Sequence, residues 1–182
     1  MKKVLKWVGI ILAIPLIIAI IFVGWVKWNV TSRLHKTYEN PPVQFKADLK
    51  TDIKTGEHIV RVRNGCIDCH GVDLGGKDVM DNPAMGKIYA TNLTPSTLKE
   101  WTDGEVARAI RHGIGRKNQP LILMPSHDYQ YLSESDLAST VAYLRLVPAV
   151  NKTNQSSHLG PISHMLIALN KAPLLSAETI DH

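Results

Sequence analysis

The chain has 182 residues, 45% of them hydrophobic, which suits one compact domain and excludes an intrinsically disordered protein. Four of the 21 Lys and Arg flank one apolar run, whereas all 16 Asp and Glu lie in residues 29–182, so that part has a net charge near +1. This balance, with no long basic run, predicts no nucleic-acid partner, and two cysteines exclude both a disulfide-dense fold and a four-cysteine zinc site.

The first predicted element is an uncharged run of 20 residues, from Trp7 to Val26. At about 1.5 Å per residue, a helix of this length crosses the roughly 30 Å hydrocarbon core of a bilayer. Tryptophans lie at both ends, as expected where a span meets the membrane surfaces. We therefore predict a membrane anchor over residues 1–28. A cleaved signal peptide is the alternative, and residues 24–28 offer no small-x-small cleavage site for it.

Residues 29–50 show little periodicity and contain a Pro-Pro pair, which is typical of a tether. A domain is expected over residues 51–150. Within it, residues 71–100 are rich in Gly, Asp and Asn and show no strand alternation, so we interpret them as a long loop. The apolar periodicity predicts three helices: one over residues 55–64, a second that begins at Thr102 and is stopped by Gly113, and a third that begins at Ser133 and ends before Pro148.

The second and third helices carry clear start signals. Thr102 is followed three residues later by Glu105, which is the pattern of a capping box, and Ser133 is a typical N-cap. Residues 151–182 form a C-terminal extension with one short apolar helix, in which four residues recur at helical spacing: Ile162, Met165, Leu166 and Leu169. We expect this helix to pack on the domain, although contact with the membrane surface or with a partner stays open.

Both cysteines lie in one motif, Cys66-Ile67-Asp68-Cys69-His70. Cys-x-x-Cys-His is the attachment signature of a c-type haem, since two thiols three residues apart can reach one edge of the porphyrin while the histidine faces the iron. The alternatives are a redox disulfide and half of a zinc site. The first lacks the βαβ pattern of thioredoxin-like proteins, and the second needs two further ligands from scattered histidines.

A haem that transfers electrons needs a second axial ligand. Met124 is our candidate because it lies 54 residues beyond His70 in an apolar loop, and Pro125 restricts it to extended geometry. The main rival is His127, while Met80 and Met85 are too close to the motif to cross easily to the other haem face.

Several segments in the same order resemble a class I cytochrome c domain. The resemblance covers about residues 50–150 and rests on Cys66 to Gly71, Asn92-Leu93-Thr94-Pro95, Trp101 to Glu105, Met124-Pro125, and Leu132-Ser133 to Tyr143-Leu144-Arg145. More narrowly, the series is similar to the haem domains of bacterial alcohol, aldehyde and gluconate dehydrogenase cytochrome subunits, which typically carry three such motifs where this chain has one.

The resemblance implies an all-α fold, a class I cytochrome c domain preceded by a single N-terminal transmembrane helix. It implies one covalent haem c, with Cys66 and Cys69 as thioethers and His70 and Met124 as axial ligands. Trp101 is a further candidate for the haem propionates, although packing in a small core would explain it equally well.

The resemblance also implies an electron carrier that is not itself an enzyme. Its expected partners are the membrane and redox proteins, namely a dehydrogenase or quinol complex as donor and a terminal oxidase as acceptor. Because haem is attached outside the cytoplasm in this family, the expected location is the bacterial inner membrane, with a single pass and the domain in the periplasm. A haem sensor or haem enzyme with a labile sixth ligand is the alternative function.

Overall fold

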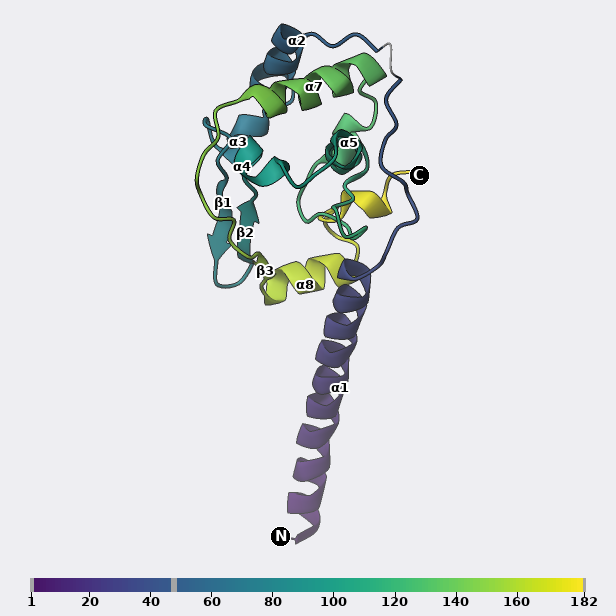
Figure 1. Ribbon diagram of the computed structural model, residues 1–182. Coiled ribbons are helices and arrows are strands. Elements are labelled where there is room, and N and C mark those ends of the chain that lie inside the picture. Colours follow the sequence, from purple (N-terminus) through teal and green to yellow (C-terminus); the bar gives the residue numbers. More distant parts are fainter. Residues whose placement is uncertain (1, 47–48, 182) are drawn as a thin grey trace.

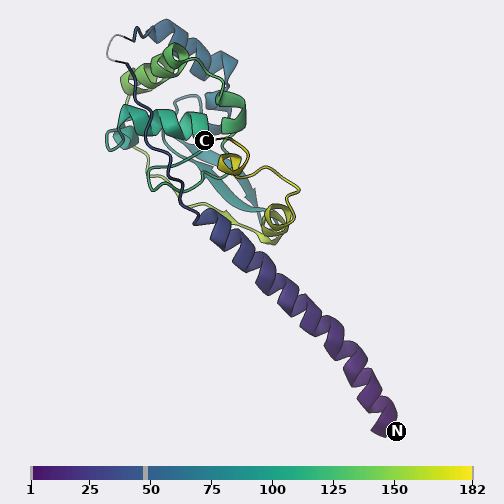
Figure 2. The ribbon, with the colours of Figure 1, turned by 90° about the vertical axis from the view of Figure 1, so that its right-hand side faces the viewer.

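A computed structural model describes residues 2–46 and 49–181. Helix α1 (Lys2–Leu34) projects from the rest of the chain as a single long rod (Figures 1 and 2). Within the described part of the chain, α1 is the one helix that is long enough and apolar enough to cross a membrane. It continues six residues beyond the predicted end of the anchor at residue 28, into the segment expected to be a tether.

The prediction of a helical domain is confirmed in its main helices. A helical stretch made of α2 (Ile53–His58) and the π-helical turn η1 (Ile59–Arg63) crosses α7 (Glu134–Leu146) at the end of the domain furthest from α1 (Figure 1). The remaining short helices of this part are α3 (Cys66–His70), α4 (Pro95–Leu98), α5 (Asp103–His112) and α6 (Ser126–Tyr129).

The predicted helix start signals are present in the structure. The Thr102 hydroxyl accepts a hydrogen bond from the Glu105 amide, while a Glu105 carboxylate oxygen accepts one from the Thr102 amide at 2.7 Å. The Ser133 hydroxyl likewise accepts a hydrogen bond from the Asp136 amide at the start of α7. These side chains satisfy amides that have no partner within the helix, so both helices begin where the sequence predicts.

The expectation of an all-α fold without strands in residues 71–100 is not confirmed. That segment forms the hairpin β1 (Lys77–Asn82) and β2 (Gly86–Ala90), and β2 also pairs with the short strand β3 (His158–Leu159). The three strands form one antiparallel sheet in the order β1-β2-β3. The helical domain therefore has a small sheet beside it, and this sheet reaches the C-terminal extension.

The core has two main parts. The larger cluster joins η1, α4, α5 and α7 and includes Val60, Leu98, Val106, Leu137 and Val141. The smaller cluster joins the end of α1 to the C-terminal extension, where α8 (Pro161–Ala168) lies across α1 and the 3₁₀ turn η2 (Ser176–Glu178) follows. The prediction of a short apolar helix in this extension is thus confirmed.

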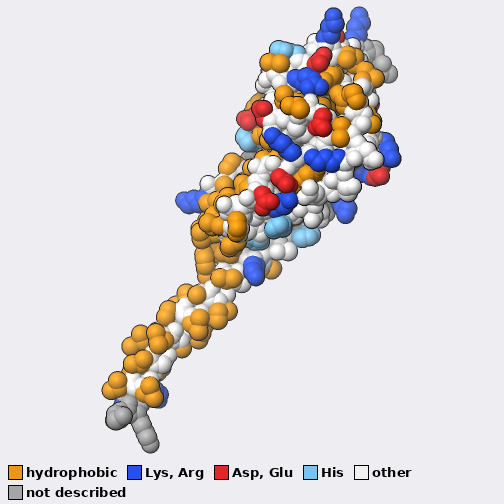
Figure 3. All heavy atoms as spheres, turned by 90° about the vertical axis from the view of Figure 1, so that its left-hand side faces the viewer, with side chains coloured by type: hydrophobic (Ala, Val, Ile, Leu, Met, Phe, Trp, Pro, Cys, Tyr) orange, Lys and Arg blue, Asp and Glu red, His pale blue; other side chains and the backbone are white. Residues whose placement is uncertain are grey.

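The surface divides in the same way as the fold. Figure 3 shows apolar side chains covering the projecting helix, whereas Lys, Arg, Asp and Glu are mixed over the rest of this face. The apolar side chains of α1 are exposed along most of its length, for example Ile11 at 64% and Ile21 at 65%. Such a helix is stable in a lipid environment, where its exposed apolar surface is solvated by acyl chains.

Candidate haem-binding site

The Cys-x-x-Cys-His motif forms helix α3, a single turn between two glycines with positive φ. Gly65 has φ +57° and Gly71 has φ +85°, values that side-chain-bearing residues rarely adopt. The turn places Cys66 and Cys69 in half-buried positions and His70 in a buried one. All three side chains are therefore presented by one rigid element, as a haem attached at two points requires.

Burial raises the pKa of the Cys66 thiol to about 11, so this thiol is protonated at neutral pH. The nucleophile of a redox-active cysteine pair is a thiolate, which this burial disfavours. Within residues 2–46 and 49–181, no group of three or more His, Cys, Asp and Glu is arranged to hold a metal ion. The burial of Cys66 thus disfavours a redox-active pair, and a zinc site lacks its further ligands among the described residues.

His70 is held in one orientation by a backbone carbonyl. Its Nδ1 lies 2.6 Å from the Thr91 carbonyl oxygen, and because a carbonyl can only accept, Nδ1 carries the proton. Burial lowers the pKa of His70, which keeps the ring neutral. The lone pair is then on Nε2, the tautomer that an imidazole needs to bind a metal ion.

Two adjoining hollows of about 230 and 270 Å³ lie beside the motif. Cys66 lines the first and Cys69 lines the second, while His70 and Met124 line both. Other side chains of the first hollow are mainly apolar: Leu93, Leu98, Trp101, Val106, Ile110, Leu121 and Leu144. The residues present therefore fit a large, flat, apolar group that meets both thiols along one edge and both predicted axial ligands.

Met124 is placed by the backbone of its loop. Its carbonyl accepts hydrogen bonds from the Ser126 amide at 2.9 Å and from the Ser176 hydroxyl. The preceding Leu123 amide donates to the Leu174 carbonyl at 2.7 Å. Both Leu174 and Ser176 belong to the C-terminal extension, so this extension supports the loop that carries the predicted ligand.

The rival ligands lie elsewhere. His127 is not among the described residues that line either hollow, and its Nδ1 is 3.2 Å from the Ser176 hydroxyl. Met80 lies on β1 opposite Ile88, and Met85 lies in the hairpin turn, where the Ser163 hydroxyl donates to its carbonyl. The structure therefore brings Met124, but none of these three, to the cavity beside His70.

Trp101 lines the first hollow and packs against the larger core cluster. It thus faces the cavity, as a haem-contacting residue would, and it also fills the core, as the simpler interpretation proposed. Its carbonyl accepts a hydrogen bond from Arg145, which joins the start of α5 to the end of α7.

Sequence reasoning from the motifs missed the supports of the site. Asn92 is fully buried, and its side chain accepts hydrogen bonds from Thr94 and donates one to the Val150 carbonyl at 2.8 Å. These bonds fix the loop whose preceding residue, Thr91, orients His70. In the sequence, the signal for this support of the Thr91 loop was the segment from Asn92 to Pro95 in the family resemblance. Every residue has a backbone carbonyl, so the residue type at position 91 does not indicate that its carbonyl orients His70.

The attachment helix, the oriented histidine and the shared apolar cavity define a small c-type cytochrome domain. The cytochrome c family model matches residues 53–148, more than half of the chain, and the chain therefore belongs to the cytochrome c family. Family membership implies covalently bound haem c and a function in electron transfer.

The chain is also similar to the fructose dehydrogenase cytochrome subunit of Gluconobacter japonicus. The two are 33% identical over 96 residues, which are 48% of this chain and 20% of that protein. The matched region thus covers only about a fifth of the relative's length. The similarity supports the prediction of a carrier related to dehydrogenase cytochrome subunits.

Proposed function

We propose that this chain is a membrane-tethered cytochrome with one haem c, which passes single electrons from a respiratory donor to an acceptor on the same membrane face. The observation that carries the proposal is the convergence of Cys66, Cys69, His70 and Met124 on two adjoining hollows, with His70 and Met124 lining both. When bound there, haem supplies reversible one-electron chemistry.

Each of the four residues has a distinct proposed role. Cys66 and Cys69 would hold the haem through thioethers, while His70, through Nε2, and Met124, through sulfur, would hold its iron. A methionine ligand would raise the reduction potential and favour electron transfer over the binding of oxygen. Trp101 and its apolar neighbours exclude water from the cavity.

We further propose that α1 spans the bacterial inner membrane once and that the domain lies in the periplasm. Support comes from the length and hydropathy of α1 and from the family's covalent haem attachment outside the cytoplasm. A tether holds the haem near membrane-bound partners and so raises its effective concentration there. Long-range charge steering is less needed, since residues 29–182 are nearly neutral.

The proposed donor is a membrane dehydrogenase or a quinol complex, and the proposed acceptor is a terminal oxidase. The similarity to a dehydrogenase cytochrome subunit favours the dehydrogenase. Native membranes solubilised in mild detergent and separated on a native gel, then stained for haem, test this assignment. Haem in a large band that contains a dehydrogenase would support it, whereas haem at the size of the chain alone would contradict a stable complex.

The axial assignment is tested by the ferric absorption spectrum of Met124→Ala. We expect loss of the methionine-to-iron charge-transfer band and a lower reduction potential. The matched control is Met85→Ala, which removes a methionine that is not among the described residues lining either hollow and should leave both readings unchanged. An unchanged spectrum for Met124→Ala would remove the assignment and favour the sensor or enzyme alternative.

A further inference from the structure

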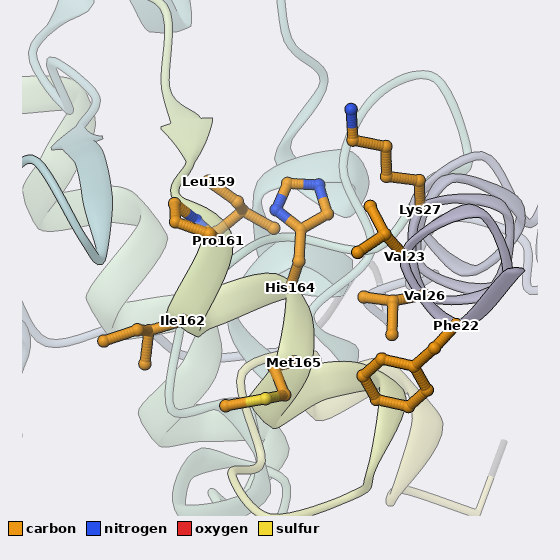
Figure 4. A pocket seen from close by; sticks show the side chains of 9 residues that line it. All are labelled: Phe22, Val23, Val26, Lys27, Leu159, Pro161, Ile162, His164 and Met165. Carbon is orange, nitrogen blue, oxygen red and sulfur yellow. The ribbon is translucent and has the colours of Figure 1, made fainter. Parts of the chain in front are cut away.

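An apolar groove of about 520 Å³ lies where α1 meets α8, at a different place from the haem site. Phe22, Val23 and Val26 form its α1 wall. Figure 4 shows α1 almost end-on, with the polar tips of Lys27 and His164 on one side of the groove and Phe22 and Met165 on the other. The groove thus has an apolar floor and one basic edge.

Helix α8 presents an apolar stripe next to this groove. Ile162, Met165 and Leu169, which caps the helix, are 40%, 41% and 42% exposed, and their spacing of three and four residues places them on one face. The opposite face is buried, with Ile167 and Ala168 packed against Val26 and Val30 of α1. Residues 161–169 contain no Lys, Arg, Asp or Glu. The stripe is therefore suited to a lipid environment rather than to water.

The level of α8 along α1 indicates what covers the stripe. The helix packs on α1 at Val26 and Val30, just where the uncharged run of α1 ends. Trp25 and Trp28 lie at the same level and are exposed on α1. Tryptophans at the end of a membrane span mark the boundary between headgroups and acyl chains. Figure 1 shows α8 lying across α1 rather than along it, as a helix in the membrane plane would.

We propose that α8 lies in the headgroup–acyl boundary of the bilayer and that the groove holds an acyl chain of a phospholipid, with Lys27 beside its phosphate. The inference rests on the proposed membrane anchoring by α1. An apolar groove with one cation at the headgroup level matches a phospholipid, because the chain needs apolar walls and the phosphate needs a positive partner.

This seating would orient the domain and not only hold it near the membrane. The end of α1 is fixed to the extension by Arg33, whose Nε donates to a Glu178 carboxylate oxygen at 2.8 Å and whose Nη1 donates to the Ile167 carbonyl. With α8 in the boundary as a second contact, the domain cannot rotate freely about α1. The haem would then face its partners in a constant orientation.

Site-directed spin labelling of the full-length, haem-loaded chain tests the proposal. Haem attachment consumes Cys66 and Cys69, so a single introduced cysteine carries the label. The test positions are Met165→Cys and Leu169→Cys, the anchor reporter is Ile11→Cys in α1, and the water reporter is Leu146→Cys, which is 66% exposed at the end of α7. The vesicles contain phosphatidylethanolamine and phosphatidylglycerol, and the relaxing agents are oxygen, which enters lipid, and a water-soluble nickel chelate.

At both test positions we expect oxygen to relax the label more than nickel does, as at Ile11, and the reverse at Leu146. A label relaxed mainly by nickel at either test position, with Ile11 in lipid, would overturn the proposal and leave the anchor intact. A label shielded from both agents would also overturn it, since a protein partner would then cover the stripe. An Ile11 label in water would overturn the anchor and the seating together.

The basic edge has its own test. Lys27→Glu places a negative charge beside the lipid phosphate, so the label at position 165 should shift toward nickel accessibility. Lys6→Glu makes the same charge change near the other end of α1 and should leave that label unchanged. Equal behaviour of the two variants would overturn the assignment of Lys27 to the phosphate.

Discussion

The crossing of α2 and α7 offers the sharpest test of the fold. Gly56 is buried there, and a Cβ atom added to it would lie 2.1 Å from the Ser139 carbonyl oxygen and 2.9 Å from the Tyr143 Cβ. The first contact is about 1.3 Å short of the 3.4 Å at which ordinary van der Waals contact begins. Because the obstacle is backbone, Gly56→Ala can be accommodated only if the two helices move apart.

The expected cost follows from two opposing terms. Overpacking a close helix contact costs roughly 3 kcal/mol at the upper end of its usual range, and replacing glycine by alanine within a helix returns about 1 kcal/mol. We therefore expect Gly56→Ala to lower the free energy of unfolding by about 2 kcal/mol. With a urea slope of ~2 kcal/mol per molar, the unfolding midpoint should fall by about 1 M.

Urea unfolding of the haem-loaded protein in detergent, followed by far-ultraviolet circular dichroism, measures this change. Gly24→Ala is the matched control, because it makes the same substitution within α1 where a Cβ would have no atom within 4 Å. That variant should unfold at the wild-type midpoint or above it. If Gly56→Ala were as stable as the wild-type protein, the close crossing of α2 and α7 would be refuted.

Three further predictions concern the hydrogen bonds of individual side chains. Thr102→Ala removes the N-cap of α5 and should lower the free energy of unfolding, measured by urea titration, by about 1 kcal/mol. Thr102→Ser keeps a hydroxyl at this position and should retain most of the stability that the N-cap provides. Hydrogen bonds from the Thr55 hydroxyl and the neighbouring amides lower the pKa of Asp52 below its ordinary value, 3.8, so the stability it provides is present above that value and lost as the pH falls through the lowered pKa. Asp52→Asn should flatten this part of the acid unfolding curve, and an unchanged curve would contradict the assignment. Ser176→Ala removes a donor to the Met124 carbonyl and should weaken the charge-transfer band of the ferric haem, while an unchanged band would show that the loop is held without it.

The elements that the sequence predicted well are those whose signals are local. A capping box lies within four residues, and both Thr102 and Ser133 cap the helices that they were expected to cap. The attachment motif is local in the same sense, since five consecutive residues contain two thiols and an imidazole. The choice of Met124 needed more than one local motif, because it combined a distance of 54 residues from His70 with an apolar loop and the restriction that Pro125 imposes, and its role as a ligand stays a prediction.

The hairpin was missed because its first strand lacks the usual signal. A strand with one buried face alternates apolar and polar residues. In β1 the two residues at each end are exposed and only the two central residues are partly buried, so this alternation is missing. The hairpin is stabilised instead by β2, where Ile88 and Tyr89 are buried, and by the turn, where the Asn82 side chain accepts hydrogen bonds from two amides. Gly86 at φ +101° completes this turn.

The role of the C-terminal extension was also outside the reach of local patterns. Its helix was predicted from apolar spacing, but its partners are far away in the sequence. Arg33 and Glu178 are separated by 145 residues, and the Ser163 hydroxyl donates to the Met85 carbonyl across 78. Such contacts depend on how the whole chain packs, and one sequence carries no direct record of them.

Three residues of this extension connect the end of α1 to the loop that carries Met124. Leu174 accepts a hydrogen bond from Leu123, Ser176 donates to Met124, and Glu178 pairs with Arg33 at the end of α1. Leu123 has φ +63°, a conformation that leucine rarely adopts, so the bond to Leu174 helps to offset a local cost. The geometry of the proposed axial ligand therefore depends on the same segment that fixes the domain to its anchor. Under the proposed seating of the domain on the membrane, residues 174–178 are the direct link between α1 and the loop that carries Met124.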